Sequence, residues 1–112
     1  YLVEDWNCDI LRIPFNQDWA LRGRRGHSGE AYLQDLDRVI AWAASQGAYT
    51  LLDLQWLQAD EPYGGNRNYV APLPDLLSIG LWEMLGERYR EEPAVLFDLF
   101  NEPHDLLPDD LH

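Results

Sequence analysis

The sequence predicts an α/β fold, a parallel sheet whose strands alternate with helices. Three short apolar runs are rich in branched and aromatic residues, and they have the length and composition of buried strands. Two longer segments between these runs repeat apolar residues at helical spacing. Since consecutive strands joined by helices pair in parallel, the order strand, helix, strand, helix, strand indicates a sheet covered by crossover helices.

The first strand and helix are predicted between residues 8 and 47. Residues 8–15 form the first strand, and residues 16–27, with their arginines and glycines, form a polar loop. Ser28 is the expected N-cap of a helix whose apolar residues recur at helical spacing, namely Leu33, Leu36, Ile40 and Ala43. Gly47 is expected to end this helix, because glycine readily adopts the left-handed conformation found there.

The second half of the chain repeats this order. Residues 48–54 form the second predicted strand, and residues 58–74, rich in proline, glycine and asparagine, form a long loop of the kind that compact domains keep mainly for function. Ser78 is the expected N-cap of a second helix that stops before Pro93. The apolar face of this helix consists of Leu81, Trp82, Leu85 and Tyr89. Residues 94–100 form the third predicted strand.

Two architectures use this unit, the doubly wound open sheet and the eight-stranded barrel, and both place function at the carboxyl ends of the strands. No glycine-rich turn follows a predicted strand, so the sequence favours a partial (β/α)₈ TIM barrel over a nucleotide-binding sheet. A complete barrel takes about 250 residues. Residues 1–112 are therefore expected to be a fragment of one domain, incomplete at both ends, that does not fold in isolation.

Composition and charge exclude several classes of partner. Twenty acidic residues against eight basic ones give a net charge of -12, which repels nucleic acids and anionic membrane surfaces. No apolar run is long enough to predict a membrane span. Cys8 is the single cysteine, and His27, His104 and His112 are spaced too widely to predict a metal site. We expect neither a cofactor nor a metal.

Polar residues end each of the predicted strands, where apolar side chains would suit packing better. They are Arg12, Asp53, Gln55, Asn101 and Glu102. One interpretation is structural: Arg12 forms an ion pair with Asp53 or Asp98 inside the sheet, and Glu102 caps the next turn. The other is general acid/base catalysis by Glu102, because a carboxyl group beside an apolar wall can donate a proton near neutral pH.

The same motifs resemble glycoside hydrolase family 5, the cellulase-like barrels. The resemblance runs from about Asp9 to Asp105 and includes Leu-Arg-Ile-Pro-Phe, Leu-Leu-Asp-Leu-Gln-Trp and the strand that ends in Asn-Glu-Pro-His. It implies that the chain covers strands two to four of the barrel, preceded by the end of the first helix at residues 1–6. It also implies that Glu102 is the acid/base, that Asn101 binds the sugar 2-hydroxyl, and that Arg12 orients a nucleophilic glutamate beyond His112.

The function that the resemblance implies is a retaining O-glycosyl hydrolase, cellulase- or endoglucanase-like, that cleaves a β-linked polysaccharide or oligosaccharide by double displacement. A secreted or extracellular location is expected, with a signal peptide upstream. Gln55 departs from the family pattern, which has histidine at this position. A carbohydrate-binding pseudoenzyme with the same barrel, a mannanase-type member of the family and a purely structural role for the polar strand ends remain as alternatives.

The aromatic residues divide by location. Trp6, Trp42 and Trp82 fall on predicted helices and are expected in the core, since a packed indole buries a large area. Trp56 follows a strand end, and Trp19, Tyr63 and Tyr69 lie in loops on the same side, where their rings can stack on sugars. Gln55 is expected to bind substrate, and His104 is expected to bind it as a hydrogen-bonding residue at the rim of the site.

Overall fold

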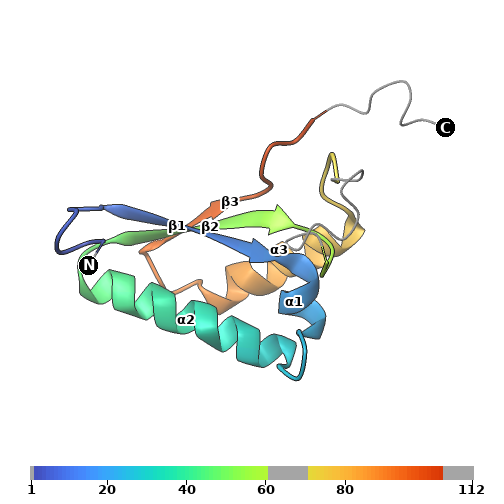
Figure 1. Ribbon diagram of the computed structural model, residues 1–112, viewed down its shortest axis with the longest axis horizontal. Coiled ribbons are helices and arrows are strands. Elements are labelled where there is room, and N and C mark those ends of the chain that lie inside the picture. The colour runs from blue at the N-terminus through green and yellow to red at the C-terminus, as the bar shows by residue number, and fades with distance from the viewer. Residues whose placement is uncertain (1, 61–70, 105–112) are drawn as a thin grey trace.

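A computed structural model describes residues 2–60 and 71–104, which form one sheet covered by helices on one face (Figure 1). The three strands are parallel in the order β1-β2-β3, so the predicted α/β class is confirmed. The strands are β1 (Ile10–Asn16), β2 (Tyr49–Trp56) and β3 (Val95–Asp98). The helices are α1 (Gln17–Arg22), α2 (Gly29–Ser45) and α3 (Leu76–Arg88).

The core lies between the sheet and the helices. Phe15 of β1 and Leu52 and Leu54 of β2 are fully buried, and they pack against the apolar faces of the helices. The buried helix residues include Leu33, Leu36 and Ile40 of α2 and Leu81 and Leu85 of α3. Each such side chain stabilises the fold by about 1.5–3 kcal/mol through burial, and the helical spacing seen in the sequence predicted them correctly.

Side chains that alternate with this core point to the other face of the sheet. The strand register aligns Arg12 with Leu51, and Pro14 with Asp53. It also aligns Asp53 with Asp98 of β3. Arg12 and the two aspartates therefore share the face that the described helices leave uncovered. Asp98 ends β3, whereas Arg12 is the third of the seven residues of β1 and Asp53 is the fifth of the eight residues of β2. The predicted position of Arg12 and Asp53 at strand ends is therefore wrong.

The start and end of α2 agree with the sequence. The Ser28 hydroxyl accepts a hydrogen bond from the Ala31 backbone N–H at 3.1 Å and caps the first turn. Gly47 follows the helix with a φ angle of 80°, a conformation that is strained for residues with a Cβ atom. The crossover from α2 to β2 is thus set by local chemistry.

The start of α3 differs from the prediction. Asp75 and not Ser78 is the N-cap, since the Asp75 carboxylate accepts from the Ser78 backbone N–H at 3.1 Å. Ser78 lies at the third helical position, where its hydroxyl accepts from the Asp75 backbone N–H at 3.2 Å and completes a capping box. Both residue types are good caps, and the sequence pattern chose the wrong one.

Segments outside the main helices also differ from expectation. Residues 17–22 of the predicted loop form α1, a six-residue helix that is too short to show apolar periodicity. Residues 2–6 form turns and not a helix end. The third strand is shorter than the predicted 94–100, because only residues 95–98 pair regularly with β2.

The predicted core tryptophans have different outcomes. Trp82 packs edge-on against Phe15 and Phe97, at ring-centroid distances of 5.8 and 5.3 Å, and joins the core as expected. Trp6 is 64% exposed and Trp42 is 46% exposed, so their placement in the core is wrong. Trp6 lies in the turns that precede β1, and Trp42 lies on the outer side of α2.

None of the helices in the described ranges is long and apolar enough to cross a membrane.

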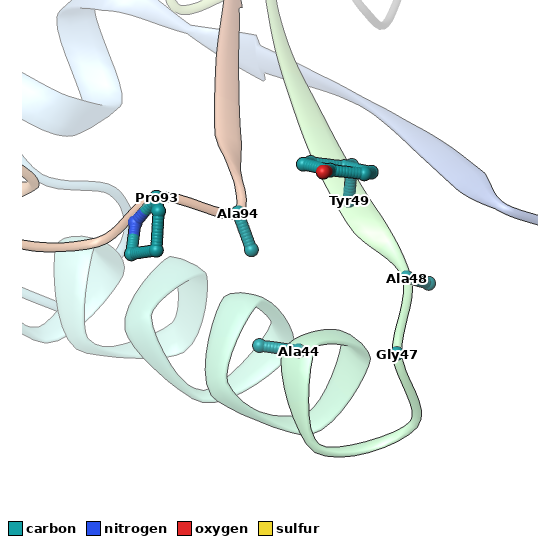
Figure 2. A pocket seen from close by; sticks show the side chains of 6 residues that line it. All are labelled: Ala44, Gly47, Ala48, Tyr49, Pro93 and Ala94. Carbon is teal, nitrogen blue, oxygen red and sulfur yellow. The ribbon is translucent and has the colours of Figure 1, made fainter.

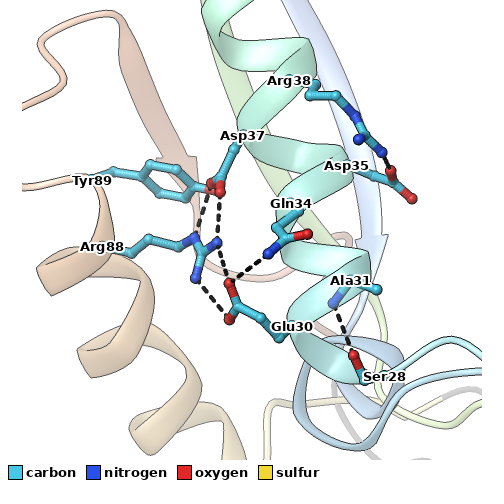
Figure 3. Close-up of polar contacts among 9 residues, drawn as sticks. All are labelled: Ser28, Glu30, Ala31, Gln34, Asp35, Asp37, Arg38, Arg88 and Tyr89. Atoms are coloured by element: carbon cyan, nitrogen blue, oxygen red, sulfur yellow. Dashed lines mark hydrogen bonds and ion pairs between the residues drawn. The ribbon is translucent and has the colours of Figure 1, made fainter.

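Arg88 joins the end of α3 to α2 (Figure 3). Its guanidinium donates to the carboxylates of both Asp37 and Glu30, at 2.5–3.1 Å. The Tyr89 hydroxyl donates to Asp37 at 2.8 Å. These contacts fix the two crossover helices relative to each other beneath the sheet.

Candidate active site

Four polar side chains from the three strands and the segment after β3 gather on the uncovered face of the sheet. The Arg12 guanidinium Nη2 donates a hydrogen bond to Asn101 Oδ1 at 2.7 Å. The same nitrogen lies 3.1 Å from Asp53 Oδ2 and 3.7 Å from Asp98 Oδ2. Arg12 is therefore the centre of a cluster that links β1, β2, β3 and the segment after β3.

The ion pairs that the structural interpretation expected are present, but Arg12 is not enclosed by them. Its side chain is 51% exposed, whereas the Asp53 side chain is completely buried. The guanidinium thus lies over a buried carboxylate and leaves its outer side accessible to solvent. In this position it can both neutralise Asp53 and contact a further group above the sheet.

Opposing effects act on the pKa of the buried Asp53 carboxyl group. Burial raises the pKa of its carboxyl group, while Arg12 lowers it and Asp98 raises it further. Within residues 2–60 and 71–104, neither Asp53 oxygen accepts a well-directed hydrogen bond. The close arginine is therefore its main electrostatic compensation in this part of the chain.

Glu102 follows this cluster directly and is exposed. Its φ angle of 48° places it in the left-handed region, which is uncommon for a residue with a Cβ atom and is a feature of strained functional sites. The preceding Asn101 backbone N–H donates to the Leu54 carbonyl at 3.0 Å, beyond the last regular pair of β2 and β3. The Phe100–Asn101 peptide, one residue before Glu102, is therefore anchored to β2.

His104 lies just beyond Glu102, at the exposed rim of the site. Its ring Nδ1 is 3.1 Å from the Glu102 carbonyl oxygen, and its backbone N–H donates to the Pro72 carbonyl at 3.0 Å. The second of these contacts ties the rim to the segment that leads into α3. The predicted role of His104 in substrate binding stays a prediction.

The remaining predicted substrate residues lie at or beyond the end of β2. Gln55 and Trp56 are its last two residues, and both are half-buried. The Trp19 indole N–H donates to the Ala59 carbonyl at 3.1 Å, and the Arg24 guanidinium lies 4.4 Å from the centre of the Trp19 ring. Tyr63 and Tyr69 lie outside the described residues, so their predicted stacking on sugars stays a prediction.

Two residues near the site, Asp98 and Asn16, were not predicted to belong to it. Asp98 was considered only as a structural ion-pair partner, yet it lies beside Asp53 in the register and contacts Arg12. The signal was its position, two residues after Leu96 on the same face of a strand. Asn16 was read as a loop residue, but it is completely buried, and its amide donates to the Gln58 carbonyl at 2.8 Å.

Two further observations bear on the choice of a functional site. Residues 2–60 and 71–104 contain no group of three or more histidine, cysteine or acidic residues that could hold a metal ion. A hollow of about 220 Å³ opens at the other end of the sheet (Figure 2). It is lined by the largely apolar set Ala44, Gly47, Ala48, Tyr49, Pro93 and Ala94. The charged cluster around Arg12 is the better candidate for a functional site.

The chain is similar to known proteins over most of its length. The family model for cellulase (glycosyl hydrolase family 5) matches residues 1–109. An endoglucanase of Paenibacillus polymyxa is 33% identical over 91% of this chain and 28% of its own length. Endoglucanase EG-II of Hypocrea jecorina is 24% identical over 95% of this chain and 25% of its own length. A probable endo-beta-1,4-glucanase B of Aspergillus kawachii is 29% identical over 91% of this chain and 29% of its own length. The chain thus spans about a quarter of the length of the curated relatives it matches.

Proposed function

Because the chain belongs to the cellulase family, glycosyl hydrolase family 5, we propose that it supplies the acid/base half of the active site of a retaining glycosidase. Its three parallel strands with crossover helices are part of a (β/α)₈ barrel. We propose further that residues 1–112 are a fragment of a single catalytic domain. The other catalytic carboxylate then comes from a later strand of the same barrel.

The observation that carries this proposal is the 2.7 Å hydrogen bond from Arg12 to Asn101. It brings a cation from the first strand beside the residue that precedes Glu102, at the strand ends where barrel enzymes hold their sites. In the proposed roles, Glu102 is the acid/base and Asn101 hydrogen-bonds the sugar 2-hydroxyl. Arg12, whose outer side is exposed, orients the nucleophilic carboxylate.

The proposed reaction is a double displacement. The nucleophilic carboxylate attacks the anomeric carbon, and protonated Glu102 gives its proton to the glycosidic oxygen as the carbon–oxygen bond breaks. Glu102, now a carboxylate, takes a proton from water, whose oxygen attacks the same carbon and releases the nucleophile. Each step inverts the anomeric centre, so the product retains its configuration. The two carboxyl groups should be about 5–5.5 Å apart in the complete barrel.

The proposed substrate is a β-linked polysaccharide or its oligosaccharides, with a β-1,4-glucan first among the candidates. The relatives named above are endoglucanases, which supports a glucan over the mannan of the mannanase-type alternative. The net charge of -12 suits a neutral polymer better than a polyanion. A secreted or extracellular location is proposed for the whole protein, because such polymers lie outside the cell.

The experiment that tests the function compares Glu102→Gln with the full-length parent enzyme on soluble β-glucan and mannan. Glutamine keeps the shape of the side chain but carries no transferable proton, so hydrolysis should fall by about 10²–10⁴-fold. Glu83→Gln, an exposed position on α3, is the matched control and should leave turnover unchanged. Undiminished turnover in Glu102→Gln would overturn the acid/base assignment.

Gln55 favours one alternative, a carbohydrate-binding pseudoenzyme. Glutamine can donate and accept hydrogen bonds but cannot carry a charge, so it cannot replace every role of the family's histidine. This alternative predicts that the full-length protein binds cello-oligosaccharides in calorimetry and releases no reducing ends. Measurable hydrolysis that depends on Glu102 decides against it.

A further inference from the structure

Trp82 makes a polar contact in addition to its packing in the core. The residue lies on α3, and its indole Nε1–H donates a hydrogen bond to the Leu99 carbonyl at 3.2 Å. Leu99 is the first residue after β3, where the chain leaves the regular ladder with β2. The contact therefore ties a helix to the start of the segment that carries Glu102.

Residues 99–101, which lead to Glu102, each have a restraint of their own. The Leu99 carbonyl is held by Trp82, and the Phe100 side chain packs against the main core. Asn101 is held by its backbone at Leu54 and by its side chain at Arg12. The positive φ of Glu102 comes at the end of this series, and such a conformation persists only where the surroundings over-determine it.

The indole is a rigid donor. Its ring meets Phe15 of β1 edge-on, with an interplanar angle of 89°, and meets Phe97 of β3 at 65°. Phe15 is completely buried, so this contact fixes the ring from the side of the sheet. Because the ring is already fixed by its neighbours, its N–H holds the Leu99 carbonyl at one position.

We propose that Trp82 is a positioning residue for Glu102, an inference that rests on the function proposed above. Its N–H fixes the Leu99 peptide, and the restraints on residues 100 and 101 carry that position to the carboxyl group. Without the N–H, Leu99 loses a fixed partner, and the Glu102 carboxyl moves away from the glycosidic oxygen. A displacement of about 1 Å at a catalytic group can lower the rate by about 10²-fold.

Two substrates distinguish positioning of the acid from general damage to the fold. A cello-oligosaccharide has a poor leaving group that needs a proton, whereas a dinitrophenyl cellobioside has a leaving group that departs without one. The ratio kcat/KM reports the first step for both substrates. Misplacing the acid should therefore lower kcat/KM for the oligosaccharide alone, while a damaged site lowers both.

The experiment uses Trp82→Phe in the full-length enzyme, because phenylalanine keeps an aromatic ring and removes the N–H. We expect kcat/KM to fall about tenfold on the oligosaccharide and to stay within about twofold on the dinitrophenyl substrate. Trp42→Phe makes the same chemical change on the exposed side of α2 and should alter neither value. Replacement of Trp82 by benzothienylalanine, which keeps the bicyclic shape but lacks the N–H, serves if Trp82→Phe does not fold.

The outcomes separate this inference from the proposed function. If kcat/KM of Trp82→Phe falls equally on both substrates, or does not fall relative to Trp42→Phe, the positioning role of Trp82 is overturned. The acid/base assignment still holds in that case, provided that Glu102→Gln remains inactive. If Glu102→Gln hydrolyses the oligosaccharide as fast as the unmodified enzyme, the acid/base assignment is overturned, and the role of Trp82 with it.

Discussion

Arg88 binds both carboxylate oxygens of Asp37, with Nε 2.9 Å from Oδ1 and Nη2 2.5 Å from Oδ2 (Figure 3). The pair connects the last turn of α3 with the middle of α2, across 51 residues of sequence. Two further hydrogen bonds join Arg88 to Glu30 at 3.0 and 3.1 Å. One side chain thereby holds the two crossover helices, and its geometry is the bidentate form that arginine and not lysine can make.

Replacement of Arg88 by methionine is expected to lower the free energy of unfolding of the full-length protein by about 1–3 kcal/mol. The variant leaves Asp37 without its bidentate partner, although Tyr89 still donates to it. Urea denaturation measures the effect. The matched control is Arg38→Met, which breaks an i,i+3 pair with Asp35 on the exposed side of α2 and should cost less than about 0.5 kcal/mol. Equal losses in the two variants would contradict the prediction.

The stabilisation by Arg88 should depend on pH in the acid range. Hydrogen bonds from Arg88 lower the pKa of Asp37 below its ordinary value, against the opposing effect of burial. A lowered folded-state pKa contributes stability that is present above the unfolded value, about pH 4, and lost as the pH falls through the folded value. Unfolding free energies measured from about pH 6 to about pH 2.5 should therefore show a shrinking difference between the unmodified protein and Arg88→Met. A difference that stays constant over this range would count against the mechanism.

Asp53 should show the opposite dependence. Burial raises the pKa of its carboxyl group, so the folded state binds the proton more tightly than the unfolded state. The folded protein therefore loses stability as the pH rises from about 4 through the folded pKa. Asp53→Asn removes this charge, and its melting temperature relative to the unmodified protein should rise between about pH 4 and about pH 7.

Asp98→Asn is the control for this measurement. It removes a carboxylate that also faces Arg12 but is 36% exposed, so the charge it removes was less costly to bury. The pH-dependent gain should be smaller than in Asp53→Asn. A larger gain in Asp98→Asn would show that burial of Asp53 is not the cause.

Gly23→Ala should destabilise the end of α1. Gly23 has φ 91° and ψ -178°, a backbone conformation essentially restricted to glycine, and an added Cβ would lie 2.2 Å from the His27 carbonyl oxygen. The expected loss is on the order of 1–3 kcal/mol in the free energy of unfolding. Gly80→Ala within α3 is the control, because its Cβ meets no atom within 4 Å, and it should stabilise by about 0.5–1 kcal/mol. A neutral Gly23→Ala would show that this turn can rearrange.

Trp56→Ala tests the predicted stacking of a sugar ring at the end of β2. A stacking contact contributes about 0.5–1.5 kcal/mol, so KM on long cello-oligosaccharides should rise by about two- to tenfold in the full-length enzyme. Trp42→Ala, on the exposed side of α2, is the control and should leave KM unchanged. An unchanged KM in Trp56→Ala would remove this residue from the substrate-binding set.

Local patterns in the sequence were enough for much of the fold. Residues within a turn or two of each other account for the order of the long elements, the Ser28 cap, the end of α2 before Gly47 and the buried faces of α2 and α3. Such features depend on side-chain spacing and on nearby backbone partners, which the sequence states directly. The short helix α1 was missed because six residues are too few to show a period.

Most residues of the site could also be identified from the sequence, because a polar residue in or directly after an apolar strand is conspicuous. The sequence alone placed Arg12 and Asp53 on two buried strands of a parallel sheet, and Asn101 and Glu102 directly after the third predicted strand. It left open whether Arg12 pairs with Asp53 or with Asp98.

Only the tertiary structure decided these contacts, because they depend on strand register and on how the helices pack beneath the sheet. The register places Asp53 and Asp98 side by side, so Arg12 meets both. Helix packing brings Trp82 to the Leu99 carbonyl and Arg88 to Glu30, across 17 and 58 residues. No local sequence pattern predicts contacts between residues so far apart in the chain. They form because all the helices and strands bury their apolar faces in one common core.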